Sequence, residues 1–299
     1  MNSATPAAVL EITDLTVDLP SSHAGGAGAD RSSGSNSGTR ILHGIDLTLR
    51  PSRIHGLAGE SGSGKTMTGL AVLGLLPHGA RTTGQIRLHA EDPVQGSANL
   101  VTLTSRQIHA LRGRVLGMVF QDPSTSLHPM LSVGHQLTDH LRYHLGLGGK
   151  VARERAVELL AQMRIPAPRE ALDRYPHQFS GGMRQRIAIA IALACEPRVL
   201  IADEPTTALD VTVQAGVLRL LRRLCDELNL AILLITHDLG VMSALADEVS
   251  VMRRGLVVET GPRERVLTDP RHVYTRSLLD ALPGRGRTLP GAEPTGGDR

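Results

Sequence analysis

Eight residues in the first quarter of the chain have the types and spacing needed to hold a polyphosphate. Residues 59–66 read GESGSGKT and fit the pattern G-x-x-x-x-G-K-[ST]. Glycines in such a loop allow positive φ and keep Cβ atoms away from the phosphates, so that backbone N–H groups can donate to phosphate oxygens. Lys65 supplies a point charge for the β- and γ-phosphates, and the hydroxyl of Thr66 can ligate Mg²⁺. The predicted binding residues are Gly59, Glu60, Ser61, Gly62, Ser63, Gly64, Lys65 and Thr66.

A loop rich in glycine and serine could match this pattern by accident, but the composition argues against that. Of the 32 lysines and arginines in the chain, only Lys65 and Lys150 are lysines. A planar guanidinium does not fit inside a phosphate loop as an ammonium does. The loop follows a strand-like segment at residues 54–58, in which we expect His55 to be a hydrogen-bonded strand histidine. A helix is expected directly after it, at residues 65–76.

Two adjacent carboxylates follow a short apolar segment much later in the chain. Residues 199–202 read VLIA, which is typical of a buried strand, and Asp203 and Glu204 come directly after it. Asp203 can hold Mg²⁺ through its water shell, and Glu204 can polarise an attacking water. Carboxylates commonly end strands, so this pair alone is weak evidence. The pair indicates a site for phosphoryl transfer only in combination with the phosphate loop at 59–66.

The elements that must position these residues alternate between strands and helices. Alternation of apolar and polar residues predicts half-buried strands at 9–19 and 41–49, with two shorter ones within 85–103 around a polar turn. Continuous apolar runs predict buried strands at residues 115–120, 199–202 and 230–236. Buried strands that alternate with helices predict an α/β fold, in which a mostly parallel sheet is covered on both faces. The first strands predict a small antiparallel sheet beside the phosphate loop.

Helical patterns fill much of the region between the two chemical segments. The pattern is helical from about residue 126 to residue 175 and again at 211–228. Residues 187–194 read IAIAIALA, which alternates and could be a strand. Their alanine content, the polar start at Ser180 and the stop at Pro197 favour a buried helix instead. By contrast, residues 21–38 are mostly serine, glycine, alanine and asparagine, which predicts a flexible surface insertion.

The bulk properties exclude several classes of protein. With 299 residues, 41% of them hydrophobic and 20% charged, the chain suits one large or two modest globular domains. It shows no signal peptide and no apolar run near the length of a membrane span. Cys195 and Cys225 lie far apart without metal-ligand spacing, and we expect core thiols in a reducing compartment. A net charge of +3, with no tryptophan and two phenylalanines, argues against a nucleic-acid partner.

The ordered set of motifs resembles that of the ATP-binding subunits of ABC transporters, over roughly residues 9–282. The motifs are GESGSGKT (59–66), VFQDP (119–123), FSGGMRQR (179–186), VLIADEPTTALD (199–210) and ITHD (235–238). The tail at residues 271–283 is similar to the HPYTxxLLxALP extension of the oligopeptide, dipeptide and nickel importer ATPases, with Val273 in place of proline. This resemblance implies a P-loop NTPase (RecA-like) core with a flanking antiparallel β subdomain and an inserted α-helical subdomain at about 122–196. We expect an ATPase domain at 1–262 and an importer-type extension at 263–299 with a disordered end.

The resemblance also implies roles around the reacting phosphate of ATP. Glu204 would polarise the attacking water, and His237 would hydrogen-bond the γ-phosphate and hold Glu204. Gln121 would contact Mg²⁺ and the water and sense the γ-phosphate. The Mg²⁺ ligands would then be Thr66, Gln121 and Asp203. The expected cofactors are therefore ATP and Mg²⁺.

Four further residues are assigned by resemblance to a contact between two subunits. Ser180, Gly181 and Gly182 would begin a helix whose N-terminus faces the γ-phosphate of a neighbouring subunit, and Asp210 would lie across the dimer contact. An ordinary N-cap is the alternative explanation for the serine. With one phosphate loop and one such segment, the chain furnishes two half-sites and completes neither.

The partners implied by the family are a second ATPase, identical or homologous, two transmembrane permease subunits, and an extracellular solute-binding protein. The helical region at about 122–196 would dock on the permease at the cytoplasmic face of a bacterial membrane. The transported solute would be an oligopeptide, a dipeptide or nickel. The sequence does not distinguish among these solutes, because the ATPase does not touch the cargo.

The chain departs from the family pattern in three places, one of which is the insertion at 21–38 next to the expected adenine position. The family usually stacks adenine on an aromatic residue near the end of the first strand, where this chain has Asp18 and Leu19, and no aromatic residue precedes Phe120. Some relatives carry a cysteine cluster near the C-terminus that is missing here, so we expect no iron–sulfur centre. A soluble ABC ATPase acting on nucleic acid or ribosomes, an exporter ATPase and a metabolic P-loop kinase are the alternatives. The importer-like tail and the SGGMRQ and DEPTTALD segments argue against them.

Overall fold

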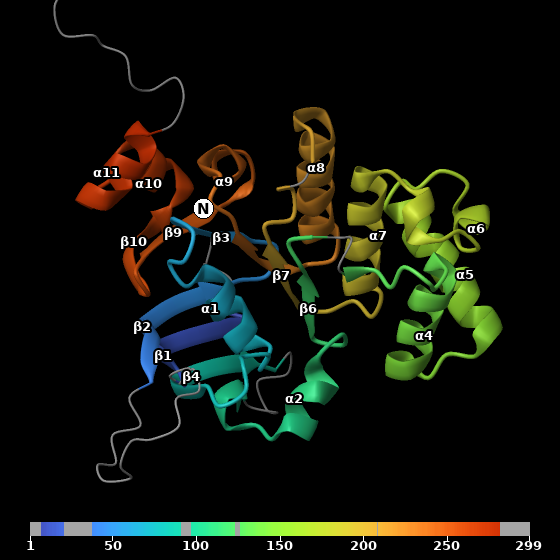
Figure 1. Cartoon of the computed structure of the whole chain (residues 1–299), viewed down its shortest axis with the longest axis horizontal. Coiled ribbons are helices and arrows are strands. Elements are labelled where there is room, and N and C mark those ends of the chain that lie inside the picture. Colours follow the sequence, from blue (N-terminus) through green and yellow to red (C-terminus); the bar gives the residue numbers. More distant parts are fainter. Residues whose placement is uncertain (1–6, 21–37, 91–96, 123–125, 208, 282–299) are drawn as a thin grey trace, which may run out of the picture.

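Two β-sheets organise the fold (Figure 1). The computed structural model describes residues 7–20, 38–90, 97–122, 126–207 and 209–281, so the expected insertion at 21–38 falls almost wholly outside the described residues. Within the described ranges, no helix has both the length and the apolar character needed to cross a membrane. Both described cysteines are free and buried, as expected for core thiols, and burial raises the pKa of Cys195 to about 11 and that of Cys225 to about 12.

The first sheet is antiparallel, with the strand order β2-β1-β4-β5. Leu10, Ile12, Leu15 and Val17 of the central strand are buried, which confirms the half-buried strand predicted there. Its strands are β1 (Leu10–Leu19), β2 (Thr39–Leu49), β4 (Arg81–His89) and β5 (Ser97–Asn99).

The two shorter strands of this sheet differ from the predicted bounds. The strand β4 begins at Arg81, before the predicted residue 85, because it pairs with β1 from Asp18 onwards. The strand β5 ends at Asn99, whose side chain accepts from the N–H of Val101 and starts the 3₁₀ helix η2 (Leu100–Thr102). The helix α2 (Ser105–Leu111) was not predicted, although a capping box of Thr104 and Gln107 marks its start.

The second sheet has the order β10-β9-β3-β8-β7-β6, and all its neighbouring pairs are parallel except β9 and β10. Every residue of β3, β7 and β8 is buried, which explains their continuous apolar character. The strands are β3 (Ile54–Ala58), β6 (Leu116–Val119), β7 (Val199–Asp203), β8 (Ala231–Ile235), β9 (Glu248–Arg253) and β10 (Leu256–Pro262).

Helices from different parts of the chain cover the two faces of the parallel sheet. Side chains alternate along a strand, so Ile201 of β7 packs with α1 (Lys65–Val72), whereas Leu200 packs with α7 (Gly181–Leu193). The segment at 187–194 is thus a buried helix, as predicted. The helix α8 (Val211–Glu227) lies on the same face as α7. The start of α1 and the start of α7 therefore belong to opposite faces of one sheet.

The helix α1 is shorter than predicted. It ends at Val72 instead of residue 76, because Gly74 has a φ of +60° and the N–H of Leu75 donates to the carbonyl of Leu70 at 2.9 Å. This geometry is a left-handed helix stop, which glycine permits without a steric cost. The helix therefore ends even though apolar residues continue at helical spacing beyond Gly74.

The region between β6 and β7 forms a helical group at one end of the molecule (Figure 1). It contains α4 (Val133–Leu145), α5 (Gly149–Gln162), α6 (Pro168–Ala171), the 3₁₀ helix η3 (Pro176–Gln178) and α7. The remaining helices are α9 (Leu239–Leu245), α10 (Arg263–Thr268) and α11 (Val273–Asp280), of which the last two lie beside β10 at the opposite end of the molecule (Figure 1).

Candidate functional site

The segment predicted to bind phosphate forms a tight loop between β3 and α1. Gly59, Gly62 and Gly64 all have positive φ, at 149°, 78° and 105°, as the sequence predicts. A Cβ on Gly59 would lie 2.2 Å from the backbone oxygen of Met252, so no larger residue fits there. A Cβ on Gly62 would meet nothing within 4 Å, which leaves this side of the loop open to a ligand.

The ammonium of Lys65 lies inside this loop. Its Nζ donates to the backbone oxygens of Gly59 and Glu60, both at 2.8 Å, and the residue is only 6% exposed. Burial lowers the pKa of Lys65, while the carboxylates of Glu204, Asp203 and Glu60 act in the opposite direction. A polyphosphate entering the loop would replace two neutral carbonyl partners with charged ones, which form stronger hydrogen bonds to an ammonium.

Asp203 ends β7 with an incompletely satisfied carboxylate. The residue is 5% exposed, and its Oδ1 has no hydrogen-bond partner among the described residues. Burial raises the pKa of Asp203, whereas the hydroxyl of Thr66 and the charge of Lys65 lower it. A buried carboxylate oxygen without a partner is costly unless it meets a cation or a donor. The donor set of Thr66 and Asp203 therefore suits Mg²⁺, a hard cation that prefers oxygen ligands.

Glu204 is the point at which three other side chains meet. Its Oε1 lies 2.7 Å from Nδ1 of His237, and its Oε2 accepts from Gln121 Nε2 at 3.0 Å and from the hydroxyl of Thr207 at 2.8 Å. Gln121, Glu204 and His237 follow β6, β7 and β8, and parallel neighbouring strands bring their carboxyl ends to one edge. The structure thus joins the three residues that the sequence analysis named as catalytic.

The electrostatics keep Glu204 ionised. Burial raises the pKa of this carboxyl, but the hydrogen bonds from His237 and Thr207 together with the nearby charges of His237 and Lys65 leave the pKa below its ordinary value. The backbone of Glu204 has a φ of +47°, and its N–H donates to the carbonyl of Ile235 at 2.8 Å. An ionised carboxylate held beside a phosphate loop can orient and polarise a water molecule.

The residues assigned to a subunit contact lie elsewhere. Ser180 is the N-cap of α7, where its side chain accepts from the N–H of Met183, and Asp210 caps α8 by accepting from Val213. A Cβ on Gly182 would lie 2.2 Å from Val213, so these two helix starts are packed against each other. Since α1 and α7 occupy opposite faces of the sheet, the chain does not bring Ser180, Gly181 and Gly182 to its own phosphate loop.

Sequence reasoning missed two residues that contact this site. Thr207 lies within the quoted DEPTTALD segment, but only the fold shows that its hydroxyl reaches Glu204. The hydroxyl of Tyr274, in α11, accepts from the backbone N–H of Glu60 at 3.2 Å. Tyr274 lies in the importer-like tail at 271–283, but only the fold shows that its hydroxyl reaches the phosphate loop. His55 behaves as predicted, with its Nε2 at 2.8 Å from the hydroxyl of Ser250.

An ion pair occupies the place where the family has its adenine-stacking aromatic. The carboxylate of Asp18 accepts from Arg40 at 2.8 and 3.0 Å. Arg40 lowers the pKa of Asp18 by this hydrogen bond, and the pair lines a cavity of about 300 Å³ together with Leu19 and Arg81. The missing aromatic is thus replaced by a polar surface.

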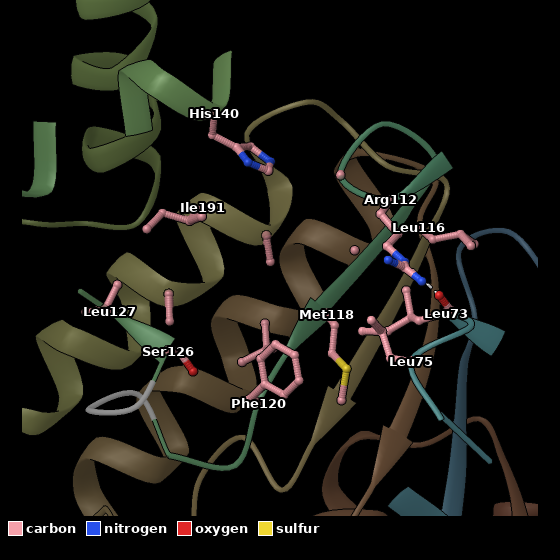
Figure 2. Close-up of a pocket in the computed structure, with 15 residues that line it drawn as sticks. Leu73, Leu75, Arg112, Leu116, Met118, Phe120, Ser126, Leu127, His140 and Ile191 are labelled. Carbon is pink, nitrogen blue, oxygen red and sulfur yellow. Dashed lines mark hydrogen bonds between the residues drawn. The ribbon is translucent and has the colours of Figure 1, made fainter. Parts of the chain in front are cut away.

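A mainly apolar cavity of about 210 Å³ is lined by Phe120, the residue before Gln121 (Figure 2). It lies between β6, α7 and α4, and the close-up shows Phe120, Met118 and Leu127 around it. Phe120 is 42% exposed, which is unusual for a phenylalanine and leaves the residue before Gln121 accessible. Arg112 closes the far side by donating to the carbonyl of Leu73 at 2.8 Å (Figure 2).

The fold and the site together define a P-loop protein built to hydrolyse a nucleoside triphosphate. The family model described as ABC transporter matches residues 42–207. A protein of Brucella abortus (strain 2308), whose name proposes an ATP-binding role in peptide import, is 48% identical over 84% of this chain and 75% of its own length. The oligopeptide transport ATP-binding protein OppD of Bacillus subtilis (strain 168) is 45% identical over 82% of this chain and 67% of its own. This chain belongs to the ABC transporter family, as one of its ATPases.

Solved structures agree with this fold. The cbiO1 protein of Clostridium perfringens, part of the cbiONQ complex, superposes with a TM-score of 0.67 at 26% identity, over 88% of this chain and 91% of that chain. The ATP-binding cassette MJ0796, solved as a dimer in a post-hydrolysis state with ADP and Pi, also gives 0.67, over 85% of this chain and 98% of that chain. Its identity of 23% shows the fold alone.

Proposed function

We propose that this protein is the ATP-hydrolysing subunit of an importer for oligopeptides or dipeptides, with nickel as the alternative cargo. The convergence of Gln121, Thr207 and His237 on Glu204 carries the proposal, because it supplies an ionised, oriented carboxylate beside a phosphate loop. Relatives whose names specify peptide import, oligopeptide transport and dipeptide transport support the cargo class. The tail at 271–283, which resembles the extension of the oligopeptide, dipeptide and nickel importer ATPases, also supports it.

Each residue then has a defined task in hydrolysis. The loop at 59–66 holds the phosphates of ATP, and Lys65 exchanges its carbonyl partners for phosphate oxygens. Thr66, Asp203 and Gln121 are the residues that would hold Mg²⁺, which when bound would offset negative charge on the phosphates. Glu204 orients the attacking water and takes its proton, and His237 keeps the carboxylate in place while contacting the γ-phosphate.

The site is completed by a second ATPase, identical or homologous. Ser180, Gly181 and Gly182 of one chain would face the nucleotide held at 59–66 of the other, with Asp210 at the contact. The placement of α1 and α7 on opposite faces of one sheet supports this arrangement, because a single chain cannot close around its own nucleotide. ATP favours the closed pair only through contacts that the open pair lacks.

The helical subdomain at about 122–196 is the part that would dock on two permease subunits, with a solute-binding protein on the outer side of the membrane. The cavity lined by Phe120 supports this, since an apolar permease helix seated against Phe120 would lie next to Gln121, which contacts Glu204. The protein would thus work at the cytoplasmic face of a bacterial membrane. Residues 1–262 would form the ATPase domain and 263–299 the extension.

Co-purification tests the proposal. We expect the protein from detergent-extracted membranes to carry two hydrophobic permease subunits.

A second experiment tests the pairing of two ATPases. We expect the Glu204→Gln protein to form a dimer with Mg-ATP. Adding Ser180→Arg to that variant should abolish the dimer while ATP still binds to the single chain. A chain that purifies as a monomer bound to RNA, or a dimer that tolerates arginine at residue 180, would contradict the proposal.

A further inference from the structure

A small cavity away from the nucleotide site is lined by arginines. Its volume is about 150 Å³, and its lining consists of Arg164, Arg186, Gly216, Arg219, Leu220 and Arg223. Four arginine side chains line this space together with Leu220; Arg186 and Arg223 are partly buried, whereas Arg164 and Arg219 are exposed at its rim. The cavity lies where the end of α5, the middle of α7 and the middle of α8 meet.

Among the described residues, backbone carbonyls accept hydrogen bonds from two of these four arginines. Arg186 Nη1 donates to the carbonyl of Met163 at 3.1 Å, and Arg223 Nη2 donates to the carbonyl of Gln162 at 2.6 Å. These bonds cap the end of α5, which is the ordinary structural use of an arginine. Two carbonyls do not balance four cations, however. The helix cap therefore accounts for only part of the cluster.

Carboxylates are scarce around the cavity. Across the described residues, Arg164, Arg186 and Arg219 make no ion pair, and Arg223 has only Glu227, with Nε and Oε2 3.9 Å apart. The same Nε is buried and has no hydrogen-bond partner in the described part of the chain. Burial, followed by the charges of Arg164 and Arg223, lowers the pKa of Arg186. Among the described residues, the four arginines therefore have a single carboxylate partner, Glu227.

The backbone leaves room for an anion. A Cβ on Gly216 would lie 3.2 Å from Nη2 of Arg186, so glycine at this position of α8 keeps the space beside that guanidinium clear. A volume of this size holds about five water molecules at their liquid volume of roughly 30 Å³ each, which is enough for one tetrahedral phosphate group. Planar guanidinium groups match two phosphate oxygens at a time.

We propose that this cavity is a binding site for a dianionic phosphate group, either free inorganic phosphate or the head of a small phosphate monoester. The bound anion bridges α5 and α7 of the helical group to α8. Because α7 begins at Ser180 and α8 is capped by Asp210, the anion resists separation of two helices whose starts are already in contact. This inference does not depend on the cargo or on the partners proposed above.

A titration of the full chain with inorganic phosphate tests the site. The Lys65→Ala background removes the response of the phosphate loop, and chloride keeps the ionic strength constant. We expect saturable binding and a rise in the melting temperature. The double variant Arg219→Gln/Arg223→Gln should bind phosphate at least about tenfold more weakly, since charge-assisted hydrogen bonds are lost. Arg106→Gln, which changes an exposed arginine on α2, should keep the parental affinity.

A second variant keeps the test valid if the double variant does not fold. Gly216→Leu leaves all four charges in place but fills the space beside Arg186, so phosphate binding should fall while the protein stays folded. Glycerol phosphate in place of phosphate distinguishes the two sources of the anion, since only a site open to monoesters binds both. Absence of saturable binding, a response equal to that of chloride, or unchanged affinity in both variants would overturn the proposal.

Discussion

The hydroxyl of Tyr274 accepts a hydrogen bond from the backbone N–H of Glu60 at 3.2 Å, and so connects the C-terminal helix α11 to the second residue of the phosphate loop. Tyr274 is 5% exposed, and the guanidinium of Arg253 lies 4.7 Å from the centroid of its ring. The carboxylate of Glu259 fixes the start of α11 by accepting from the N–H groups of Arg271 and His272. The tail is therefore a support of the nucleotide site.

Replacing Tyr274 with phenylalanine should weaken ATP binding about two- to tenfold, because one neutral hydrogen bond contributes about 0.5–1.5 kcal/mol. The ring and its contact with Arg253 remain, so the change isolates the hydroxyl. We expect KM for ATP to rise with little change in kcat, since the loop loses order before the chemical step. Tyr143→Phe, at a 71% exposed tyrosine, is the control. Equal KM values in the Tyr274 variant and the parent would rule out this role.

Lys65→Ala should abolish ATP binding in ordinary assays. Hydrogen bonds to charged groups contribute about 1.5–3 kcal/mol each, so the loss of two phosphate contacts corresponds to an affinity reduced by more than about 100-fold. Equilibrium binding of a fluorescent ATP analogue measures this loss, and Lys150→Ala, at the other lysine of the chain, is the matched control. Unchanged nucleotide affinity in the Lys65 variant would refute the assignment of the loop.

Glu204→Gln should leave ATP binding intact and slow hydrolysis by about 10²–10⁴-fold, the usual contribution of a general base, or about 3–5 kcal/mol of barrier. The amide keeps the shape of the carboxylate but cannot take a proton from water. Single-turnover hydrolysis measures the rate, and Glu264→Gln, at a side chain that is 86% exposed, serves for comparison. Hydrolysis at the parental rate would remove Glu204 from its role.

Thr207→Val should shift the pH profile of hydrolysis. The hydrogen bond from Thr207 helps to hold the pKa of Glu204 below its ordinary value, so its removal raises that pKa. Glu204 acts as a base only when ionised, and the acid limb of kcat/KM against pH should therefore move to higher pH. The corresponding contribution to stability is present above the unfolded pKa and is lost as pH falls through the folded pKa. Thr212→Val is the control, and an unmoved acid limb would contradict the prediction.

The motifs and most of the helices and strands were predictable from the sequence alone, because they depend on residues that lie close together in the chain. A phosphate loop needs glycine at fixed positions and a lysine inside it, and a fully buried parallel strand needs an unbroken apolar run. These requirements act within a few residues, so they appear as short patterns such as those at 59–66 and 199–204. Where a single glycine acts against the pattern, as Gly74 does at the end of α1, the predicted bounds were wrong.

Only the tertiary structure decided which distant residues meet. The order β10-β9-β3-β8-β7-β6 brings the ends of three strands to one edge, and this places Gln121 and His237 on Glu204. Alternation of side chains along β7 sends α1 and α7 to opposite faces and leaves the site of one chain incomplete. The contact of Tyr274 with Glu60 joins residues that are 214 positions apart. Such contacts depend on strand order and packing, which no pattern of neighbouring residues contains.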